Sequence, residues 1–462
     1  MTTTTTNIGA IQDELDRLTS ASGIRQVPGI SMAIFDGEKV WELVSGTANT
    51  RSGVAVRPET LFRIASITKL YTATLVMQLV DQGKVDLDRP LVEQLPEFRL
   101  ADPADTAAVT PRHLLTHTSG ISGDLEFPPG RGDDAVKNWV ANLAGVQPLF
   151  PPGLTHSYSN AGLNVLGRLV EYVLDTTWDR ALQEEIVTPL GLSETVTLPE
   201  DVIPKLHALG NYTDVENDVL NPIETWDADR GSGPCGEISA SARDLIAFAR
   251  MHLDGGAGPD GTRLLSQATA ASMTVPQITL PPHGIADHWG LGFELYQSGD
   301  RIIPGHGGNV DAQTSTLYLI PDRHAAVAIL TNSDRGSMHV QPLLERILDE
   351  WWGVHLRPHL EPPSGTPDVP IEPYLGTYDR GDMYFEVARK DGELTLTLTD
   401  RYHRMPGPNS QTLPLTPCPE EGVFLATIPG APRGLSVVFR RWGDDGRLYM
   451  HAGGRTTPKA EN

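Results

Sequence analysis

The sequence predicts an α+β fold: an antiparallel sheet flanked by helices, with a helical subdomain, followed by a small all-β barrel. Strand-like runs lie near both ends of residues 8–356, and mainly helical patterns separate them. Residues 357–373 are rich in proline, which is typical of a semi-rigid linker. Residues 374–457 contain short strand-like runs and no helical pattern, which favours a closed barrel. A chain of 462 residues is long for one domain, so we expect two.

The order of elements places sheet strands at both ends of the main domain. A helix is expected over 8–20, and strands over 29–35 and 39–44 flank the turn signal Asp36-Gly37. Poorly periodic stretches within the helical part are expected to be a rim or loops over a site. Further helices are expected from 66 to 83, after 110, and at 134–144, 161–174, 178–187, 241–253 and 341–352. Further strands are expected at 289–296, 313–320 and 325–331, and in the barrel at 383–389, 393–399, 422–427, 435–441 and 447–451.

Composition argues against several classes of partner. A net charge of −23 disfavours nucleic acid and anionic membrane surfaces, which attract basic proteins. Met1–Asn7 has neither the basic nor the apolar region of a signal peptide, and no apolar run approaches the roughly 18 residues that span a bilayer. Cys235 and Cys418 are far apart, which argues against a disulfide framework. These features predict a cytoplasmic protein with no nucleic-acid or membrane partner.

A serine and a lysine stand at the start of the helix that leaves residue 66. The apolar residues Leu70, Ala73 and Met77 recur at helical spacing, so Ser66 lies at the helix N-terminus. Backbone N–H groups are unpaired there, and the helix dipole is positive. Lys69 follows one turn later on the same face. A hydroxyl beside an amine is the start of a nucleophile with its own base, although serine is also a common helix cap.

Two further motifs follow in the order that this chemistry needs. Tyr158 and Asn160 lie between a Pro-Pro-Gly loop and a long apolar helix, so a phenol and an amide are held at a loop–helix junction. His306 is followed by Gly307 and Gly308, which allow a substrate backbone to approach closely, while the histidine adds a titratable ring. Each motif alone is commonplace, and the combination carries the argument.

Together the motifs S-x-x-K, Y-x-N and H-x-G resemble those of serine hydrolases related to class C β-lactamases and penicillin-binding DD-peptidases. Residues 114–120 (L-L-T-H-T-S-G), 189–192 (P-L-G-L) and 236–239 (G-E-I-S) are similar to supporting phrases of that family. The resemblance covers roughly residues 10–352. It implies a β-lactamase/transpeptidase-like sheet and a reaction through an acyl-enzyme.

The resemblance also implies roles for side chains. Ser66 is the nucleophile, and either Lys69 or Tyr158 is its base, a choice that the sequence leaves open. Asn160 orients Lys69 or a substrate amide. Lys69, together with His306, favours Tyr158 as a phenolate or as a proton shuttle. No metal and no cofactor are expected.

Backbone groups and a distant arginine complete the expected site. The N–H groups of Ser66 and Asn309 form an oxyanion hole, typically worth about 3 kcal/mol per donor. Relatives that recognise a free carboxylate generally carry threonine where this chain has Gly307, which disfavours β-lactam and D-Ala-D-Ala substrates. Gly308 lets substrate approach. Arg455 is placed to present a guanidinium to a substrate carboxylate or carbonyl, although a solvated arginine near a frayed terminus is the favoured alternative.

The C-terminal part resembles a lipocalin-like module of some relatives, beginning at Tyr374-Leu375-Gly376-Thr377-Tyr378. Those relatives include D-aminopeptidase-like enzymes and stand-alone thioesterases of the penicillin-binding-protein type, which cyclise nonribosomal peptides. In such enzymes the module can form a wall of the active site.

We therefore expect a serine hydrolase or acyltransferase acting on an intracellular ester, amide or thioester of a small molecule or peptide, including a carrier-bound thioester. The alternatives are a peptide-cyclising thioesterase, a D-aminopeptidase or esterase, and a non-catalytic ligand-binding relative. Gly231–Gly236 fits G-x-G-x-x-G but lacks the preceding strand of a dinucleotide site. His113 and His117 are expected to share a helix face and to be structural. The sequence does not predict the oligomeric state.

Overall fold

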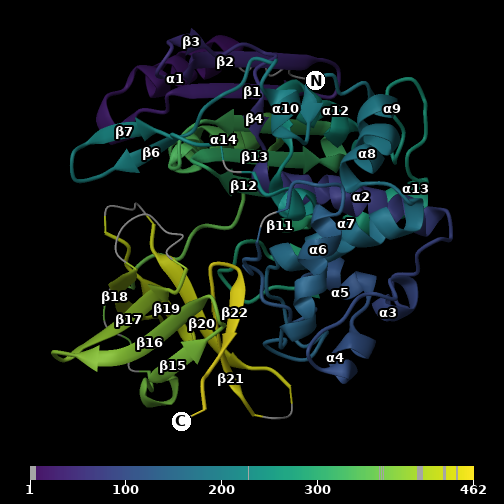
Figure 1. Cartoon of the computed structure of the whole chain (residues 1–462). Helices are drawn as coiled ribbons and strands as arrows, with labels where there is room; N and C mark the ends of the chain where they lie inside the picture. The colour runs from purple at the N-terminus through teal and green to yellow at the C-terminus, as the bar shows by residue number, and fades with distance from the viewer. Residues whose placement is uncertain are drawn as a thin grey trace.

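The main domain is built on a nine-stranded antiparallel sheet (Figure 1). The structure, a computed structural model, describes residues 7–128, 130–226, 228–363, 365, 367, 369–402, 409–429, 433–443 and 446–461. In sheet order the strands are β3 (Val54–Ala55), β2 (Val40–Asn49), β1 (Gly29–Phe35), β14 (Ala325–Thr331), β13 (Gln313–Ile320), β12 (Arg301–Val310), β11 (Glu294–Ser298), β10 (His288–Trp289) and β9 (Ile278–Thr279).

Strands from the two ends of the domain meet at the centre of this sheet, as the sequence predicts. β1 pairs antiparallel with β14, and Ile34 lies opposite Val327. Successive side chains of β1 alternate between two hydrophobic cores, because strand residues point to opposite faces. Met32 packs toward helices α1 and α14, whereas Ala33 packs toward α2 and α12. These helices are α1 (Ile8–Ser20), α14 (Gly336–Trp352), α2 (Thr68–Asp81) and α12 (Ala242–Leu253).

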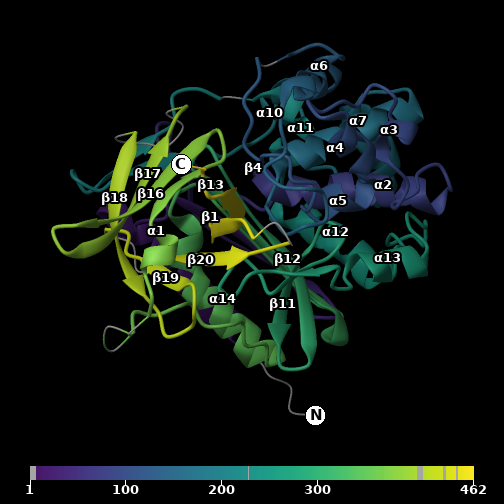
Figure 2. The ribbon, with the colours of Figure 1, turned by 90° about the horizontal axis from the view of Figure 1, so that it is seen from below.

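The helical subdomain lies on the α2 side of the sheet (Figures 1 and 2). Its central helix, α7, packs against both α2 and α5. Thr110 caps α5, since its side chain accepts a hydrogen bond from the His113 N–H. The helices here are α3 (Leu91–Gln94), α4 (Pro103–Ala108), α5 (Pro111–Leu115), α6 (Ala135–Ala141), α7 (Asn160–Leu174), α8 (Trp178–Leu182), α9 (Thr188–Leu190), α10 (Pro199–Val202), α11 (Gly233–Gly236) and α13 (Gln267–Met273). Short strands join them at β4 (Phe62–Arg63), β5 (Thr195–Val196), β6 (Asn211–Asp214), β7 (Val219–Pro222) and β8 (Ser239–Ala240).

Two strand expectations near the third motif need correction. The run 289–296 is not one strand, because Gly292 has φ +95° and turns the chain between β10 and β11. No strand was expected over 301–310, yet the H-G-G segment belongs to β12, where three glycines and Pro304 interrupt the alternating apolar pattern of a strand.

The C-terminal domain is a nearly closed eight-stranded barrel, as predicted. Its first and last strands meet at the seam, where the Ala460 N–H donates to the Thr377 carbonyl at 2.8 Å. Tyr378 also forms a bridge with Lys459 there. The strands are β15 (Gly376–Asp379), β16 (Met383–Lys390), β17 (Glu393–Asp400), β18 (Ser410–Pro417), β19 (Val423–Ala426), β20 (Leu435–Arg441), β21 (Leu448–Ala452) and β22 (Arg455–Pro458).

The barrel lies beside the main domain, and β12 lies between the barrel and the helical subdomain (Figure 2). Residues 364, 366 and 368 of the expected linker lie outside the described residues. In the part of the chain that the structure describes, none of the helices combines the length and the apolar character needed to cross a membrane.

Candidate active site

Ser66 lies in a tight turn directly before α2. The turn, Ala65–Ile67, is a 3-10 helix, and Ala65 has φ +49°, a left-handed conformation that is uncommon for a residue with a side chain. Two hydrogen bonds hold the preceding residue, Ile64: its N–H donates to the Ile238 carbonyl at 2.9 Å, and the Ser315 hydroxyl donates to its carbonyl at 2.8 Å. The serine is therefore presented at the start of the helix by a braced backbone, as the sequence predicts.

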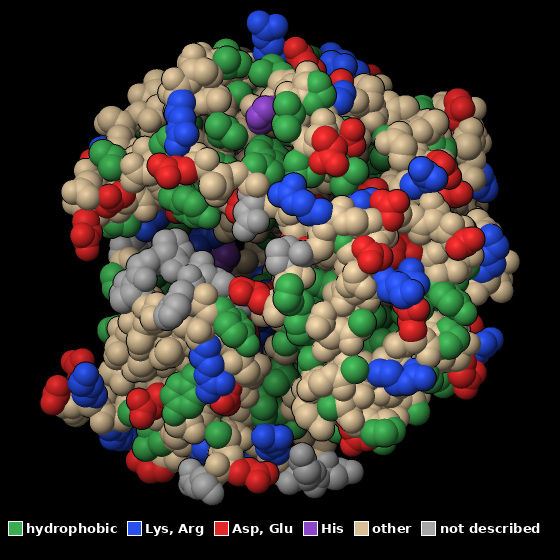
Figure 3. All heavy atoms as spheres, viewed as in Figure 1, with side chains coloured by type: hydrophobic (Ala, Val, Ile, Leu, Met, Phe, Trp, Pro, Cys, Tyr) green, Lys and Arg blue, Asp and Glu red, His purple; other side chains and the backbone are tan. Residues whose placement is uncertain are grey.

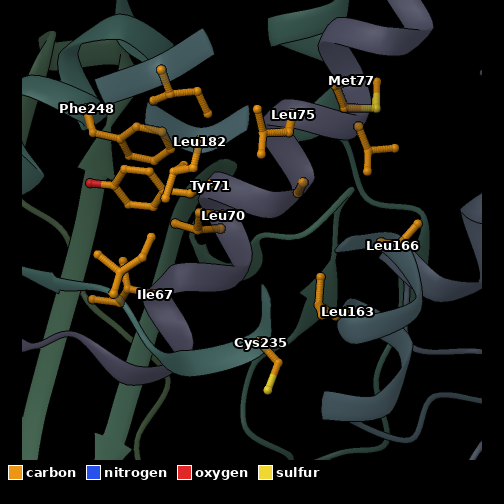
Figure 4. Packing of buried hydrophobic residues seen from close by; sticks show 14 of the residues in the cluster. Ile67, Leu70, Tyr71, Leu75, Met77, Leu163, Leu166, Leu182, Cys235 and Phe248 are labelled. Atoms are coloured by element: carbon orange, nitrogen blue, oxygen red, sulfur yellow. The ribbon is translucent and has the colours of Figure 1, made fainter. Parts of the chain in front are cut away.

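Helix α2 is buried on nearly all sides, which makes it a rigid base for the site (Figure 4). The Tyr71 ring stacks on Phe248 with centroids 3.8 Å apart and an interplanar angle of 12°. Leu163 and Leu166 of α7 belong to the same core. This packing fixes the backbone of α2, so the Cα of Lys69 is held in a constant position next to Ser66.

Lys69 is held between the nucleophile and a backbone carbonyl. Its Nζ lies 2.9 Å from Ser66 Oγ and donates to the Cys235 carbonyl at 2.7 Å. Only 1% of the residue is exposed. This burial lowers the pKa of Lys69 to about 8, because the charged form loses its hydration. Compared with an ordinary lysine, a larger fraction of the amine is therefore uncharged near pH 7, and the uncharged amine can accept the proton of Ser66.

Tyr158 is a buried neutral phenol rather than the expected phenolate. Burial raises its pKa well above 10, and a hydrogen bond with Ser66 opposes this shift without reversing it. Lys69 Nζ lies 4.9 Å from the centroid of the Tyr158 ring. The phenol is thus placed to donate a proton rather than to take the first one.

His306 supplies no positive charge to this phenol. Burial, followed by repulsion from Lys69, lowers the pKa of His306 to about 3. Its Nδ1 lies 2.6 Å from the Gly307 carbonyl oxygen, so Nδ1 carries the proton and donates it there. The ring lies 6.2 Å from that of Tyr158, measured between centroids. His306 therefore shapes the site as a neutral ring.

Glu294 is a site residue that the sequence analysis missed. Its Oε2 accepts hydrogen bonds from the Tyr296 hydroxyl at 2.6 Å and from the Gly307 N–H at 3.2 Å. Burial raises the pKa of this carboxyl to about 7. No sequence signal marks it, because β10 and β11 were expected to form one strand and Glu294 follows the turn between them.

The edge of β12 beside Ser66 points backbone N–H groups toward the site. Along β12, pairing with β11 ends at Gly305, so the edge of β12 beyond Gly305 is not paired with β11. Gly307 donates its N–H off that edge to Glu294. N–H groups two residues apart point to the same side of a strand, so the Asn309 N–H points off the same edge. A Cβ on Gly308 would collide with the Ile64 carbonyl, which shows how closely β12 passes the serine turn.

Asn160 is turned toward an acidic residue rather than toward Lys69. Its Nδ2 donates to Asp124 Oδ1 at 2.9 Å. The described hydrogen bonds of the Lys69 amine instead join it to Ser66 and Cys235. Asn160 thus belongs to the wall of the site in this structure.

The hairpin of β21 and β22 forms that wall. The Tyr158 N–H donates to the Gly454 carbonyl at 2.9 Å. The Thr456 N–H donates to Ser157 Oγ at 3.1 Å, and its hydroxyl donates to the His156 carbonyl at 2.8 Å. Figure 3 shows the surface hollowed between the main domain and the barrel. The barrel therefore fixes the loop that carries Tyr158.

Arg455 is part of this wall, so the favoured alternative of a solvated arginine is wrong. Its Nη2 donates to Asp124 Oδ1 at 2.8 Å, and its side chain is 23% exposed. The guanidinium carbon lies 5.2 Å from the Tyr158 ring centroid.

His117 does not share a helix face with His113, because α5 ends at Leu115 and His117 has φ +54°. Its Nδ1 accepts the Ser159 N–H at 3.0 Å, so it positions the Tyr158 loop. Across the described residues, no group of three or more His, Cys, Asp or Glu side chains is arranged to hold a metal ion.

Comparison with known proteins adds independent evidence. The profile of the beta-lactamase family matches residues 15–350. "Penicillin-binding protein 4" of Amycolatopsis lactamdurans is 38% identical over 357 residues, which span 77% of this chain and 93% of that protein.

Three solved structures, of two proteins, are similar over much of the chain. The crystal structure of SurE has a TM-score of 0.81 and 30% identity over 98% of each chain, and SurE with D-Leu has a TM-score of 0.77. The D-amino acid amidase of Ochrobactrum anthropi SV3, complexed with L-phenylalanine amide, has a TM-score of 0.61 and 26% identity over 74% of this chain and 97% of that one. The protein therefore belongs to the beta-lactamase family of serine hydrolases.

Proposed function

We propose that the protein forms an acyl-enzyme at Ser66 from an ester, amide or thioester donor. One observation carries this proposal: Ser66 Oγ lies 2.9 Å from the amine of the buried Lys69, whose pKa is about 8. A nucleophile and a base with a matched pKa are in hydrogen-bond reach, which is the geometry that nucleophilic catalysis needs.

The first half-reaction follows from the protonation states. Neutral Lys69 accepts the Ser66 hydroxyl proton while Oγ bonds to the donor carbonyl carbon. The resulting oxyanion is stabilised by the N–H groups of Ser66 and Asn309. As the tetrahedral intermediate collapses, the Tyr158 phenol donates its proton to the leaving group and regains one from Lys69. The acyl group remains on Ser66 until water or an amine attacks.

For the substrate, we propose a peptidyl or aminoacyl donor with a D-configured residue at the acyl position. The related structures support this choice, since one contains D-Leu and another is of a D-amino acid amidase. Gly307 provides no hydroxyl for a substrate carboxylate, which disfavours donors with a free carboxylate next to the scissile bond. A cyclising thioesterase is a second candidate, because the barrel walls the site as expected for that class.

Mass spectrometry tests the acyl-enzyme directly. A fluorophosphonate probe should add one phosphonyl mass to the Ser66 peptide, and p-nitrophenyl esters and peptidyl thioesters should add a transient acyl mass. Ser66→Ala is the control and should stay unlabelled. A folded wild-type protein that remains unlabelled by several ester and thioester probes would contradict the proposal.

The fate of the acyl group separates hydrolysis from transfer. A D-leucyl peptide thioester should release free acid, a cyclic product or both, and added amino-acid amides should divert the acyl group if the enzyme is a transferase. Release of acid alone, at all amine concentrations, would leave the hydrolase as the proposed function and remove the cyclase.

A further inference from the structure

Asp124 links Asn160, at the start of α7, to Arg455 of the barrel. The residue lies beyond α5, and its side chain is 17% exposed. Its Oδ1 accepts hydrogen bonds from Asn160 Nδ2 at 2.9 Å and from Arg455 Nη2 at 2.8 Å. Its Oδ2 lies 2.5 Å from Arg455 Nε, so the carboxylate meets the guanidinium through both oxygens.

A second arginine of the barrel balances the charges of this network. Arg380 Nη2 lies 3.8 Å from Asp124 Oδ2. Arg380 also donates to the buried Asp382 at 2.9 and 3.3 Å. Two guanidinium groups therefore face two carboxylates. Burial disfavours the charge on Arg455, but attraction by Asp124, with smaller contributions from Tyr158 and Asp382, raises the pKa of Arg455, so the arginine stays charged.

From this geometry we propose that Asp124 is a specificity-determining residue, which neutralises Arg455 and so makes the site select acyl substrates without a free carboxylate. The inference rests on the proposed function and names the polarity of its substrate. Arg455 lies 5.2 Å from the Tyr158 ring, so its charge acts within the site. Its Nη1 donates only a long hydrogen bond, 3.3 Å, to the Gly453 carbonyl, which leaves N–H capacity for a neutral substrate carbonyl.

A charge-neutral isostere isolates this role. Asp124→Asn keeps the side-chain size and one acceptor oxygen for Asn160 or Arg455, while it removes the negative charge. The network then has one uncompensated guanidinium in a partly buried place, where a charge is screened less than at the surface. A carboxylate on the substrate becomes the counter-ion that Asp124 otherwise supplies.

Two matched ester pairs test the proposal. In one pair the leaving phenol carries either a carboxylate or a carboxamide: these are the butanoyl esters of 3-hydroxybenzoate and of 3-hydroxybenzamide. In the other pair the acyl group carries the carboxylate or the carboxamide: these are phenyl hydrogen isophthalate and phenyl 3-carbamoylbenzoate. For each pair, kcat/KM of the carboxylate is divided by kcat/KM of the carboxamide. Asp88→Asn is the control, since Asp88 pairs with Arg112 on the surface and its loss changes the net charge equally.

The wild type should prefer the carboxamide, and Asp124→Asn should raise the carboxylate-to-carboxamide ratio at least tenfold in one pair. Asp88→Asn should leave both ratios within twofold, and Arg455→Gln in the Asp124→Asn background should abolish the gain. Ratios unchanged by Asp124→Asn, in an enzyme whose Ser66 is still labelled by fluorophosphonate, would overturn this inference alone. If Ser66 of the wild type is not labelled at all, the proposed function fails first.

Discussion

Burial shifts three titratable side chains around Ser66 toward their neutral forms. Lys69 and His306 lose affinity for protons, while Tyr158 holds its proton more tightly. The sequence alone leaves open whether the lysine or the tyrosine is the base. The pKa directions favour Lys69, because it is the group that can be neutral before substrate arrives.

Acylation should depend on pH through Lys69. The pKa of about 8 means that the neutral amine increases as pH rises through 8, so the acylation rate should rise from pH 6 and level off above pH 9. In the Lys69→Arg variant the guanidinium cannot deprotonate, so the acylation rate should fall by about 10²- to 10⁴-fold. Stopped-flow labelling with an activated ester measures both. A rate that is constant from pH 6 to 9 would contradict a lysine base.

Neighbouring glycines of β12 should respond differently to alanine. A Cβ at Gly307 would find only the Ser315 carbonyl oxygen, 3.9 Å away, so Gly307→Ala should keep or slightly raise stability. At Gly308 the Cβ would meet Ile64 and Ser315, so Gly308→Ala should cost about 1–3 kcal/mol. It should also slow Ser66 labelling, because the serine turn must move. Urea unfolding and labelling compare the pair, and equal behaviour would show that β12 does not press on the turn.

At the scale of elements, β12 and α2 make the site in opposite ways. β12 has an irregular sequence and is held by its surroundings: Arg63 forms ion pairs with Asp311, in the turn after β12, and with Glu237. Asp311 and Ala312 both have positive φ, which suits a two-residue hairpin turn. Helix α2 has a regular apolar sequence and is held by its own packing.

The stacked rings of Tyr71, in α2, and Phe248, in α12, offer a test of that packing. Tyr71 is fully buried, and its hydroxyl has no hydrogen-bond partner among the described residues. Tyr71→Phe should therefore stabilise the protein by about 1 kcal/mol, because it removes an unsatisfied polar group. Tyr71→Ala should destabilise it by about 3–5 kcal/mol through the cavity beside Phe248. Chemical denaturation measures both, and a destabilising Tyr71→Phe would reveal a hydroxyl partner.

At the scale of the whole molecule, the contact between barrel and main domain is rich in buried histidine. His156 lies 6.2 Å from His451 of the barrel, between ring centroids, and neither ring is exposed by more than 2%. Neither His156 ring nitrogen has a hydrogen-bond partner within the described ranges. These rings are tolerated only while neutral, so proton binding and folding are coupled here.

Stability should fall as pH falls below about 6.5, the ordinary histidine pKa. The unfolded chain then binds protons that the folded histidines refuse, down to the folded pKa of about 3 at His306 and His451. Four buried carboxyls act oppositely, since burial raises their pKa values: Glu237 and Glu294, to about 7, and Glu171 and Asp244. The histidines outnumber them: His117, His156, His252, His306 and His451.

Urea unfolding at pH 7.5, 6.5 and 5.5 measures this dependence. Each net proton taken up on unfolding is worth about 1.4 kcal/mol per pH unit. The double variant His156→Gln and His451→Gln should show a smaller loss between pH 6.5 and 5.5 than the wild type. An equal loss in the double variant and in the wild type would mean that these two rings do not couple proton binding to unfolding.

Sequence periodicity was sufficient for the regular elements. Helix α1 and strands β13 and β14 have the predicted bounds, because their apolar spacing matches the burial of one face or of both. The order of S-x-x-K, Y-x-N and H-x-G was sufficient for the family, because the three motifs supply nucleophile, amine, phenol and glycine-rich strand in the order that this chemistry needs. These features are local in the chain, so they can be read along it.

Contacts between distant segments were decided only by the tertiary structure. Arg455 meets Asp124, 331 residues away along the chain, and no spacing encodes that pairing. Glu294 and the edge of β12 became site elements through strand register, and Lys69 acquired its pKa through burial. Burial and register depend on the packing of the whole chain. The residues therefore indicated the reaction class, whereas only the folded structure gives Lys69 the lowered pKa that favours it as the base and places Arg455 in the wall of the site.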